Sequence, residues 1–250
     1  MQHLIDSDVD YTIQYSSFHE DSPEHRMSQI EIAKTQLSKN LPASLNSSVL
    51  DIGCGWGFAL SALLELGFVD VQGIDIDEGQ VEVCRKYGLR ASQASDPVAF
   101  LDSCGETFDV VLLIDVLEHV PKEKQVPLLR AIYRRLRVGG RLIVSVPNAS
   151  HPLASHWFYN DFTHCCSYTE RSLRFVLRNG WFERISLEPP PPAKRPSLRL
   201  WSADVRNALW SAAFMYLWRK FLVRELSWER LENAQLGLNI ICVAYKEPTT

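Results

Sequence analysis

The residues that point most directly to chemistry form the segment Asp51-Ile-Gly-Cys-Gly-Trp-Gly57, which is followed by an acid at Asp75. Glycines in such a loop let the backbone approach a ligand closely, and the first N–H groups of the following helix point at its polar end. Asp75 comes 22 residues after Gly53, a spacing at which a carboxylate can hydrogen-bond both ribose hydroxyls. The pattern predicts a nucleoside-binding loop. A tight turn with an N-capping acid is the purely structural alternative.

Two residues of this loop indicate which nucleoside it binds. A dinucleotide fingerprint requires a third glycine at the position that Phe58 occupies. Asp51 lies two residues before Gly53, where its carboxylate repels a pyrophosphate but suits an ammonium group. A nucleoside that carries a cationic amino acid is therefore favoured over NAD, and a nicotinamide-dependent oxidoreductase is the alternative.

Three side chains farther along the chain could move a proton. His164 and Asp161 are three residues apart, close enough for the carboxylate to orient the imidazole. A hydroxyl acceptor needs a base with a pKa near 7, which predicts His164 with Asp161 as the general base, and His119 as a second candidate. The structural alternatives are that Asp161 and His164 only hold their polar loop together, and that His119 only fixes its loop by hydrogen bonds to the backbone. A metal site built from Asp115, Asp161 and His164 is disfavoured, so no metal is predicted.

Alternating strands and helices from Ser48 onward would position these residues. The expected strands are 48–52, 71–75, 89–94, 110–114, 141–146, 182–187 and 239–245. The expected helices are 58–66, 78–87, 122–136, ended by Gly139-Gly140, and 170–178, with Thr169 as N-cap. Such alternation implies right-handed crossovers and a doubly wound sheet, whose ligands bind outside the carboxyl ends of the strands.

Four segments in this order resemble motifs of class I S-adenosylmethionine-dependent methyltransferases, especially the small-molecule branch with a Leu-Glu-His motif. They are 49–57, 73–77, 108–120 and 136–140. The resemblance covers 48–188 and implies a Rossmann-like α/β fold with a doubly wound seven-stranded sheet, order 3-2-1-4-5-7-6, strand 7 antiparallel. The expected domains are an N-terminal helical cap (1–46), the methyltransferase domain (47–188 and 239–250) and a basic, tryptophan-rich helical insertion between strands 6 and 7 (189–238).

The resemblance also implies a cofactor, S-adenosylmethionine, and the residues that would hold it. They are Asp51, Gly53 and Gly55 at the methionine moiety, Asp75 at the ribose, Ile76 and Asp96 at the adenine, and Asp115 and Val116 at the methyl-bearing sulfur. Arg26 could reach the cofactor carboxylate, an ordinary surface charge being the alternative.

The expected reaction is O-methylation of a small acceptor. Asp161-Phe-Thr-His164, followed by Tyr168-Thr, resembles a pattern of methyltransferases that act on sugars and related metabolites. The acceptor would then be a sugar, a lipid-linked glycan or a similar small molecule. A non-catalytic adenosyl-binding membrane adaptor is the alternative from another functional class.

The amino-acid composition excludes several other classes of protein. Among 250 residues, 46% are apolar and 22% charged, which argues against extensive disorder. A net charge of −4 gives no reason to expect a nucleic-acid surface. The six cysteines form no CxxC pair, and residues 1–27 lack the apolar core of a signal peptide. A cytoplasmic protein is expected.

One basic segment interrupts this pattern. From Pro190 to Arg224, seven Lys or Arg face a single acid, and Trp201, Trp210 and Trp218 are interleaved. The longest apolar stretch, 208–218, has 11 residues including one serine, which is too short for a spanning helix of ~20. Residues 194–224 could form an interfacial helix that contacts the inner membrane surface. Burial of this helix against the core or a second copy is the alternative, and the sequence leaves the oligomeric state open.

Overall fold

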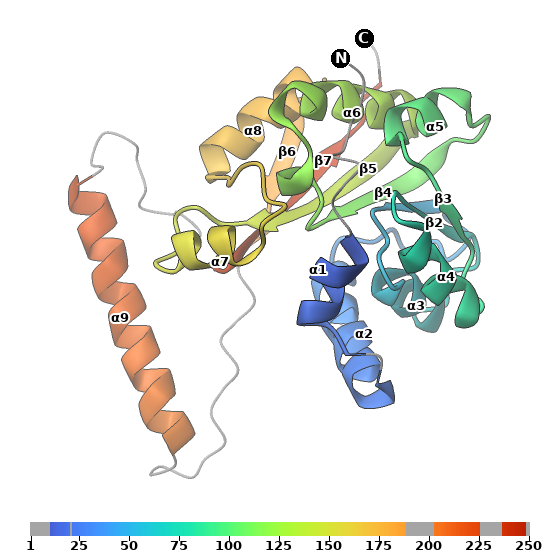
Figure 1. Ribbon diagram of the computed structural model, residues 1–250. Coiled ribbons are helices and arrows are strands. Elements are labelled where there is room, and N and C mark those ends of the chain that lie inside the picture. Colours follow the sequence, from blue (N-terminus) through green and yellow to red (C-terminus); the bar gives the residue numbers. More distant parts are fainter. Residues whose placement is uncertain (1–10, 21, 189–202, 226–236, 249–250) are drawn as a thin grey trace.

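Seven strands form one sheet in the order β3-β2-β1-β4-β5-β7-β6 (Figure 1). The computed structural model describes residues 11–20, 22–188, 203–225 and 237–248. The strands are β1 Val49–Ile52, β2 Val71–Asp75, β3 Ala91–Gln93, β4 Phe108–Ile114, β5 Leu136–Pro147, β6 Arg184–Leu187 and β7 Asn239–Tyr245. The first five pair in parallel, whereas β7 runs antiparallel to both β5 and β6. The fold predicted from the sequence, including its strand order, is confirmed.

Helices cover both faces of the sheet (Figure 1). They are α1 Tyr11–Phe18, α2 Pro23–Leu37, α3 Phe58–Glu65, α4 Glu78–Lys86, α5 Pro97–Ser103, the 3-10 turn η1 Leu117–His119, α6 Lys122–Arg135, α7 Ala154–Asn160, α8 Glu170–Asn179 and α9 Ala203–Glu225. Leu63 of α3 and Cys84 of α4 belong to one apolar core, and Leu129 of α6 and Leu177 of α8 to the other. Burial on both faces explains why the central strands are almost continuously apolar.

Most helix and strand boundaries differ from the sequence expectation by at most two residues, but β5 begins well before the expected Arg141. Gly139-Gly140 was expected to end the helix, but α6 already ends at Arg135 and β5 begins at Leu136. The reason is pairing: Leu136 faces Phe108 of β4, and the N–H of Gly139 donates to the carbonyl of Lys246. The predicted N-cap Thr169 is confirmed, because its hydroxyl accepts from the N–H of Ser172.

The segment between β6 and β7 contributes one long helix. Of the predicted insertion 189–238, the structure describes α9 and residues 237–238, and the cations Lys194, Arg195 and Arg199 lie outside the described residues. In Figure 1, α9 stands outside the two helical layers, beside α7. Among the described helices, none is long and apolar enough to cross a membrane.

Close packing behind the glycine loop predicts the cost of a single methyl group at Gly73. A Cβ there would lie 2.7 Å from Cys54 Cβ and 2.8 Å from Leu60 Cδ1, both in the core. We expect Gly73→Ala to lower the free energy of unfolding by ~1–3 kcal/mol, the range for overpacking a core, as measured by urea denaturation. Gly105→Ala is the control, since nothing lies within 4 Å of its Cβ position. Equal stabilities of the two variants would contradict this packing argument.

Candidate active site

The loop after β1 is shaped by glycines that have close neighbours. Gly53 has φ +73° and Gly55 has φ +52°, values in the left-handed region that favours glycine. A Cβ on Gly53 would lie 2.4 Å from a methyl group of Val116, and one on Gly55 would lie 2.7 Å from the hydroxyl of Tyr15. The loop therefore fits between the residue that follows β4 and helix α1 only because it carries no side chains at these two positions.

The acid at the end of β2 holds this loop in place. Asp75 Oδ2 accepts a hydrogen bond of 2.8 Å from the N–H of Gly55, and its Oδ1 accepts one of 3.0 Å from the N–H of Asp77. Asp51 is buried in β1 nearby. Burial, together with the charge of Asp75, raises the pKa of Asp51 to about 7. A cationic group bound there would favour the ionised carboxylate.

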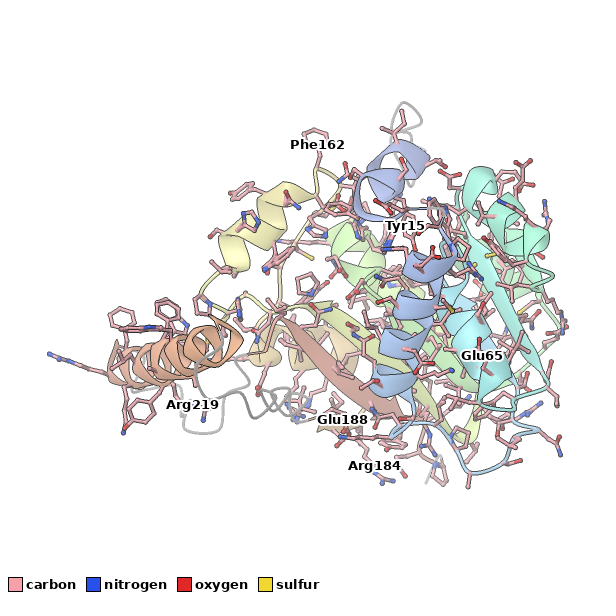
Figure 2. All side chains as sticks on the ribbon, turned by 90° about the horizontal axis from the view of Figure 1, so that it is seen from below. Tyr15, Glu65, Phe162, Arg184, Glu188 and Arg219 are labelled. Atoms are coloured by element: carbon pink, nitrogen blue, oxygen red, sulfur yellow. The ribbon has the colours of Figure 1, made fainter. Side chains whose placement is uncertain are left out.

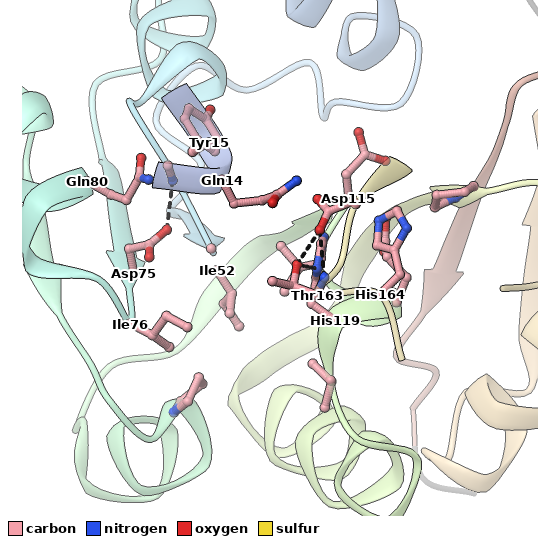
Figure 3. Close-up of a pocket in the computed structure, with 18 of the residues that line it drawn as sticks. Gln14, Tyr15, Ile52, Asp75, Ile76, Gln80, Asp115, His119, Thr163 and His164 are labelled. Carbon is pink, nitrogen blue, oxygen red and sulfur yellow. Dashed lines mark hydrogen bonds between the residues drawn. The ribbon is translucent and has the colours of Figure 1, made fainter. Parts of the chain in front are cut away.

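A cavity of about 470 Å³ opens at this edge of the sheet, a volume typical of small-molecule sites. The site residues predicted from the sequence line it, except Arg26 and Asp51, which is buried in β1. Figure 3 shows Asp75 and Ile76 at one side of the cavity and His119, Thr163 and His164 at the other, with Ile52 between them. Asp96 also lines it, and its Oδ1 caps α5 by accepting from the N–H groups of Val98 and Ala99.

Asp115 marks the turn at the end of β4. Its φ of +52° is unusual for a residue other than glycine, and such backbone strain concentrates at functional sites. Its Oδ1 accepts hydrogen bonds from Ser145 Oγ at 2.9 Å and from Asn239 Nδ2 at 2.8 Å. Two neighbouring strands, β5 and β7, thus fix the orientation of this carboxylate toward the cavity.

The predicted proton-transfer residues are connected differently from the expectation. Asp161 Oδ1 accepts from the hydroxyl of Thr163 at 2.6 Å, and the Thr163 oxygen lies 2.8 Å from Nδ1 of His119. His164 instead turns its Nδ1 toward the carbonyl oxygen of Phe158, at 3.1 Å. The expectation that Asp161 orients His164 is therefore wrong, because the carboxylate acts through Thr163 on His119.

The two imidazoles and a buried acid form the far side of the cavity. The ring centroids of His119 and His164 are 4.6 Å apart. Burial and the neighbouring His164 lower the pKa of His119 to about 4, so His119 is neutral at pH 7. Burial, and then the charge of Asp115, raise the pKa of Glu118 well above its ordinary value. Glu118 is the acid of the Leu-Glu-His motif, for which no role was expected from the sequence.

Arg26 supports the loop from behind. It is buried, and its guanidinium donates to the carbonyl of Trp56 at 2.9 Å and to the hydroxyl of Ser61 at 2.8 Å. It also stacks on the ring of Tyr87, with 3.7 Å from Cζ to the ring centroid. An ordinary surface charge is therefore the wrong description of Arg26. It does not line the cavity.

The strand order, the glycine loop and the cavity at the carboxyl ends of the strands define a class I S-adenosylmethionine-dependent methyltransferase. Residues 24–183 match the family described as methyltransferase domain. The chain belongs to this family, and the S-adenosylmethionine cofactor predicted from the sequence is the cofactor of this class. The nicotinamide-dependent alternative is set aside on the same ground.

Curated relatives agree with the family. They include ubiquinone biosynthesis O-methyltransferases from Idiomarina loihiensis, 28% identical over 131 residues, and from Pseudomonas entomophila, 34% identical over 105 residues. The matches cover 50% and 40% of this chain and 52% and 44% of those proteins. The chain thus spans about half the length of the curated relatives it matches.

Solved structures share the fold. A S-adenosylmethionine-dependent methyltransferase from Archaeoglobus fulgidus superposes with a TM-score of 0.64 at 21% identity, over 95% of this chain and 100% of that one. Magnesium protoporphyrin IX methyltransferase from Synechocystis PCC 6803, solved with bound SAH, superposes with a TM-score of 0.53 at 17% identity, over 95% and 94%. At these identities the likeness concerns the fold alone.

Proposed function

We propose that this chain transfers the methyl group of S-adenosylmethionine to a hydroxyl oxygen of a small, lipid-linked acceptor. The arrangement of the cavity is the observation that carries the proposal. Asp75 and Ile76 line one side, Asp115 and the histidines line the other (Figure 3), and Val116 also lines the cavity. Methyl transfer is an in-line displacement, which depends mainly on holding donor and acceptor in alignment.

The proposed cofactor contacts follow the order of the strands. In this proposal the residues at the cofactor are Asp51, Gly53 and Gly55 at the methionine moiety, Asp75 at the ribose, Ile76 and Asp96 at the adenine, and Asp115 and Val116 at the sulfur. The raised pKa of Asp51 supports its role, because a buried carboxylate that is costly to ionise gains from an ammonium partner. The positive φ values of Gly53 and Gly55 support a backbone that lies directly against the ligand.

The proposed acceptor contacts are His119 and His164, where the hydroxyl proton would leave. Asp161 is then a positioning residue that acts through Thr163 on His119. Oxygen is favoured as the methylated atom because the curated relatives are named O-methyltransferases. A sugar or lipid-linked glycan stays within this proposal, because its hydroxyl groups need the same chemistry.

Helix α9 supports a lipid-linked acceptor at an anionic membrane surface. Five of its large apolar side chains are exposed, from Trp210 at 76% to Phe221 at 51%, the others being Phe214, Tyr216 and Leu217. Trp218 Nε1 donates to the carbonyl of Ser150, which joins the helix to the segment before α7. Figure 2 shows α9, with Arg219, standing apart from the sheet. Exposed aromatic residues beside cations are typical of interfacial helices.

Methyl transfer is tested with methyl-labelled S-adenosylmethionine and two cell extracts, one of lipids and one of water-soluble metabolites. We expect label in the lipid fraction and a product that is an alkali-stable ether. His164→Ala should reduce turnover by roughly 10²–10⁴, the range for losing acid–base assistance, with S-adenosylhomocysteine affinity unchanged. His156→Ala is the matched control, because this histidine is exposed on α7 and does not line the cavity. Cofactor binding without transfer in either extract would favour the non-catalytic adaptor instead.

The pKa of Asp51 predicts how cofactor binding depends on pH. The pKa is raised to about 7 in the protein without ligand, and an ammonium group binds the ionised carboxylate. Affinity for S-adenosylhomocysteine should therefore be constant above pH ~8 and fall as pH decreases through 7, approaching about tenfold per pH unit. Calorimetry from pH 5.5 to 8.5 measures this. Asp51→Asn should bind more weakly at pH 8 with little pH dependence; an equally steep profile would remove Asp51 from the methionine site.

Membrane contact through α9 is tested by vesicle flotation. Each cation near an anionic surface contributes about 1 kcal/mol, so binding should require anionic lipid, weaken with salt, and fall when Arg219 and Lys220 are changed to Glu. The control makes the same charge change at exposed Lys39 and Arg178, which lie on the body of the protein. If the wild-type protein stays in solution with anionic vesicles at low salt, membrane contact is excluded, and α9 covers a second copy or the core.

A further inference from the structure

Three side chains at the acceptor side of the cavity converge although no hydrogen bond joins them. Glu118 and His119 belong to η1 after β4, and His164 follows α7. One oxygen or nitrogen atom from each lies within 4.8 Å of those of the other two. Figure 3 shows His119 and His164 together beside Thr163, facing the same space. This set differs from the combination of Asp115, Asp161 and His164, which is disfavoured from the sequence.

Hydrogen bonds fix which nitrogen of each imidazole is free. The Thr163 hydroxyl gives its only hydrogen to Asp161 Oδ1 at 2.6 Å, so it can only accept from His119 Nδ1, 2.8 Å away. The carbonyl oxygen of Phe158, 3.1 Å from His164 Nδ1, also can only accept. Both imidazoles are therefore protonated at Nδ1. In this tautomer the lone pair of a neutral ring is on Nε2, an atom that metal ions commonly bind.

Glu118 supplies the third side chain of the cluster, and its carboxylate lacks a hydrogen-bond partner among the described residues. Its side chain is 1% exposed, and neither carboxylate oxygen has a hydrogen-bond partner among the described residues. Burying an unpaired carboxylate is costly, and buried charges are normally paired or coordinate metals. Asp75, another buried acid of the cavity, meets this requirement with two backbone N–H groups. Among the described residues, no side chain supplies a partner for the Glu118 carboxylate.

We propose that Glu118, His119 and His164 bind one divalent transition-metal cation, Zn²⁺ or an ion of similar ligand preference. Two imidazole nitrogens and one carboxylate oxygen are a ligand set that such ions accept, with open positions left for a further ligand. An ion bound at about 2.1 Å from each atom brings tetrahedral ligands to ~3.4 Å from one another. The three ligand atoms now lie within 4.8 Å of one another, so side-chain rotations that move each atom by less than ~1 Å would bring them to this spacing.

The surroundings of the cluster fit this assignment. A ligating histidine normally donates its other N–H to a carboxylate, a carbonyl or a polar group linked to one. His119 has Thr163 and Asp161 in this role, and His164 has the Phe158 carbonyl. All three proposed ligands line the cavity. If the chain methylates hydroxyl groups as proposed above, the ion would bind the acceptor oxygen and lower its pKa. The hydroxyl proton would then leave to water, and His119 and His164 would be ligands in place of proton acceptors.

Cobalt binding tests the site without any turnover. Chelator-treated protein is titrated with Co²⁺, followed by its visible absorption, and the bound Co²⁺ is displaced with Zn²⁺. We expect one equivalent to bind. Glu118→Gln and His164→Ala should each weaken binding by at least about 100-fold, and Thr163→Val by ~10–100-fold, the range for losing a residue that supports a ligand. His25→Ala is the control, because His19 and His25 form a separate pair, with 3.0 Å between Nδ1 and Nε2.

The outcomes separate this proposal from the proposed function. Absence of saturable Co²⁺ or Zn²⁺ binding, or equal affinity in wild type and Glu118→Gln, overturns the metal site whatever the activity. Binding that is lost in His25→Ala but kept in His164→Ala assigns the ion to the other pair and also overturns it. Thermal unfolding of each metal-free variant shows whether it is folded, and Thr163→Val provides a second test that keeps all three ligands. Metal binding without methyl transfer would instead leave the site standing and remove the proposed function.

Discussion

The close approach of the loops that follow β1 and β4 is the constraint on which the rest of the site depends. These strands are neighbours in the parallel sheet, so their carboxyl ends open at the same edge. The loops can meet only because Gly53 has no side chain where Val116 packs. The same contact brings Asp115 and η1 against the glycine loop, which places the proposed cofactor and acceptor sides within one cavity. A side chain at Gly53 would separate the two sides.

Support for this contact comes from elements far away in the chain. Asp75 ties the glycine loop to β2, Arg26 of α2 holds its back through Trp56 and Ser61, and Asn239 of β7 orients Asp115. The hydrogen bonds of Asp75 and Arg26 are buried, where a hydrogen bond to a charged group is worth more than at the surface, whereas the one between Asn239 and Asp115 is exposed. The site is therefore rigid at its base. Helix α9 stands outside the helical layers of the sheet (Figure 1).

The sequence predicts what depends on local pattern. Apolar strands, the glycine loop, Thr169 as a cap and the strand order could be predicted because periodicity and turn chemistry are local, and because four motifs occur in the family order. The start of β5 could not be predicted, since pairing with β4 and with Lys246 prevails over the helix-ending signal of Gly139. The burial of Arg26 could not be predicted from the sequence either. Whether a guanidinium lies at the surface or behind a loop depends on how α2 packs.

The candidate catalytic side was predicted in its residues but not in its connections. Asp161 and His164 are close in sequence, which suggested a pair. In the structure, however, the Asp161 carboxylate binds the Thr163 hydroxyl, and the Thr163 hydroxyl in turn binds His119. Glu118 was overlooked because a residue of a short motif shows nothing of its burial. Neither of its carboxylate oxygens has a hydrogen-bond partner within the part of the chain that the structure describes, and this changes the role inferred for the two histidines. The two imidazoles alone would suit proton transfer, but beside a buried carboxylate that has no partner among the described residues they form the ligand set proposed above for a cation.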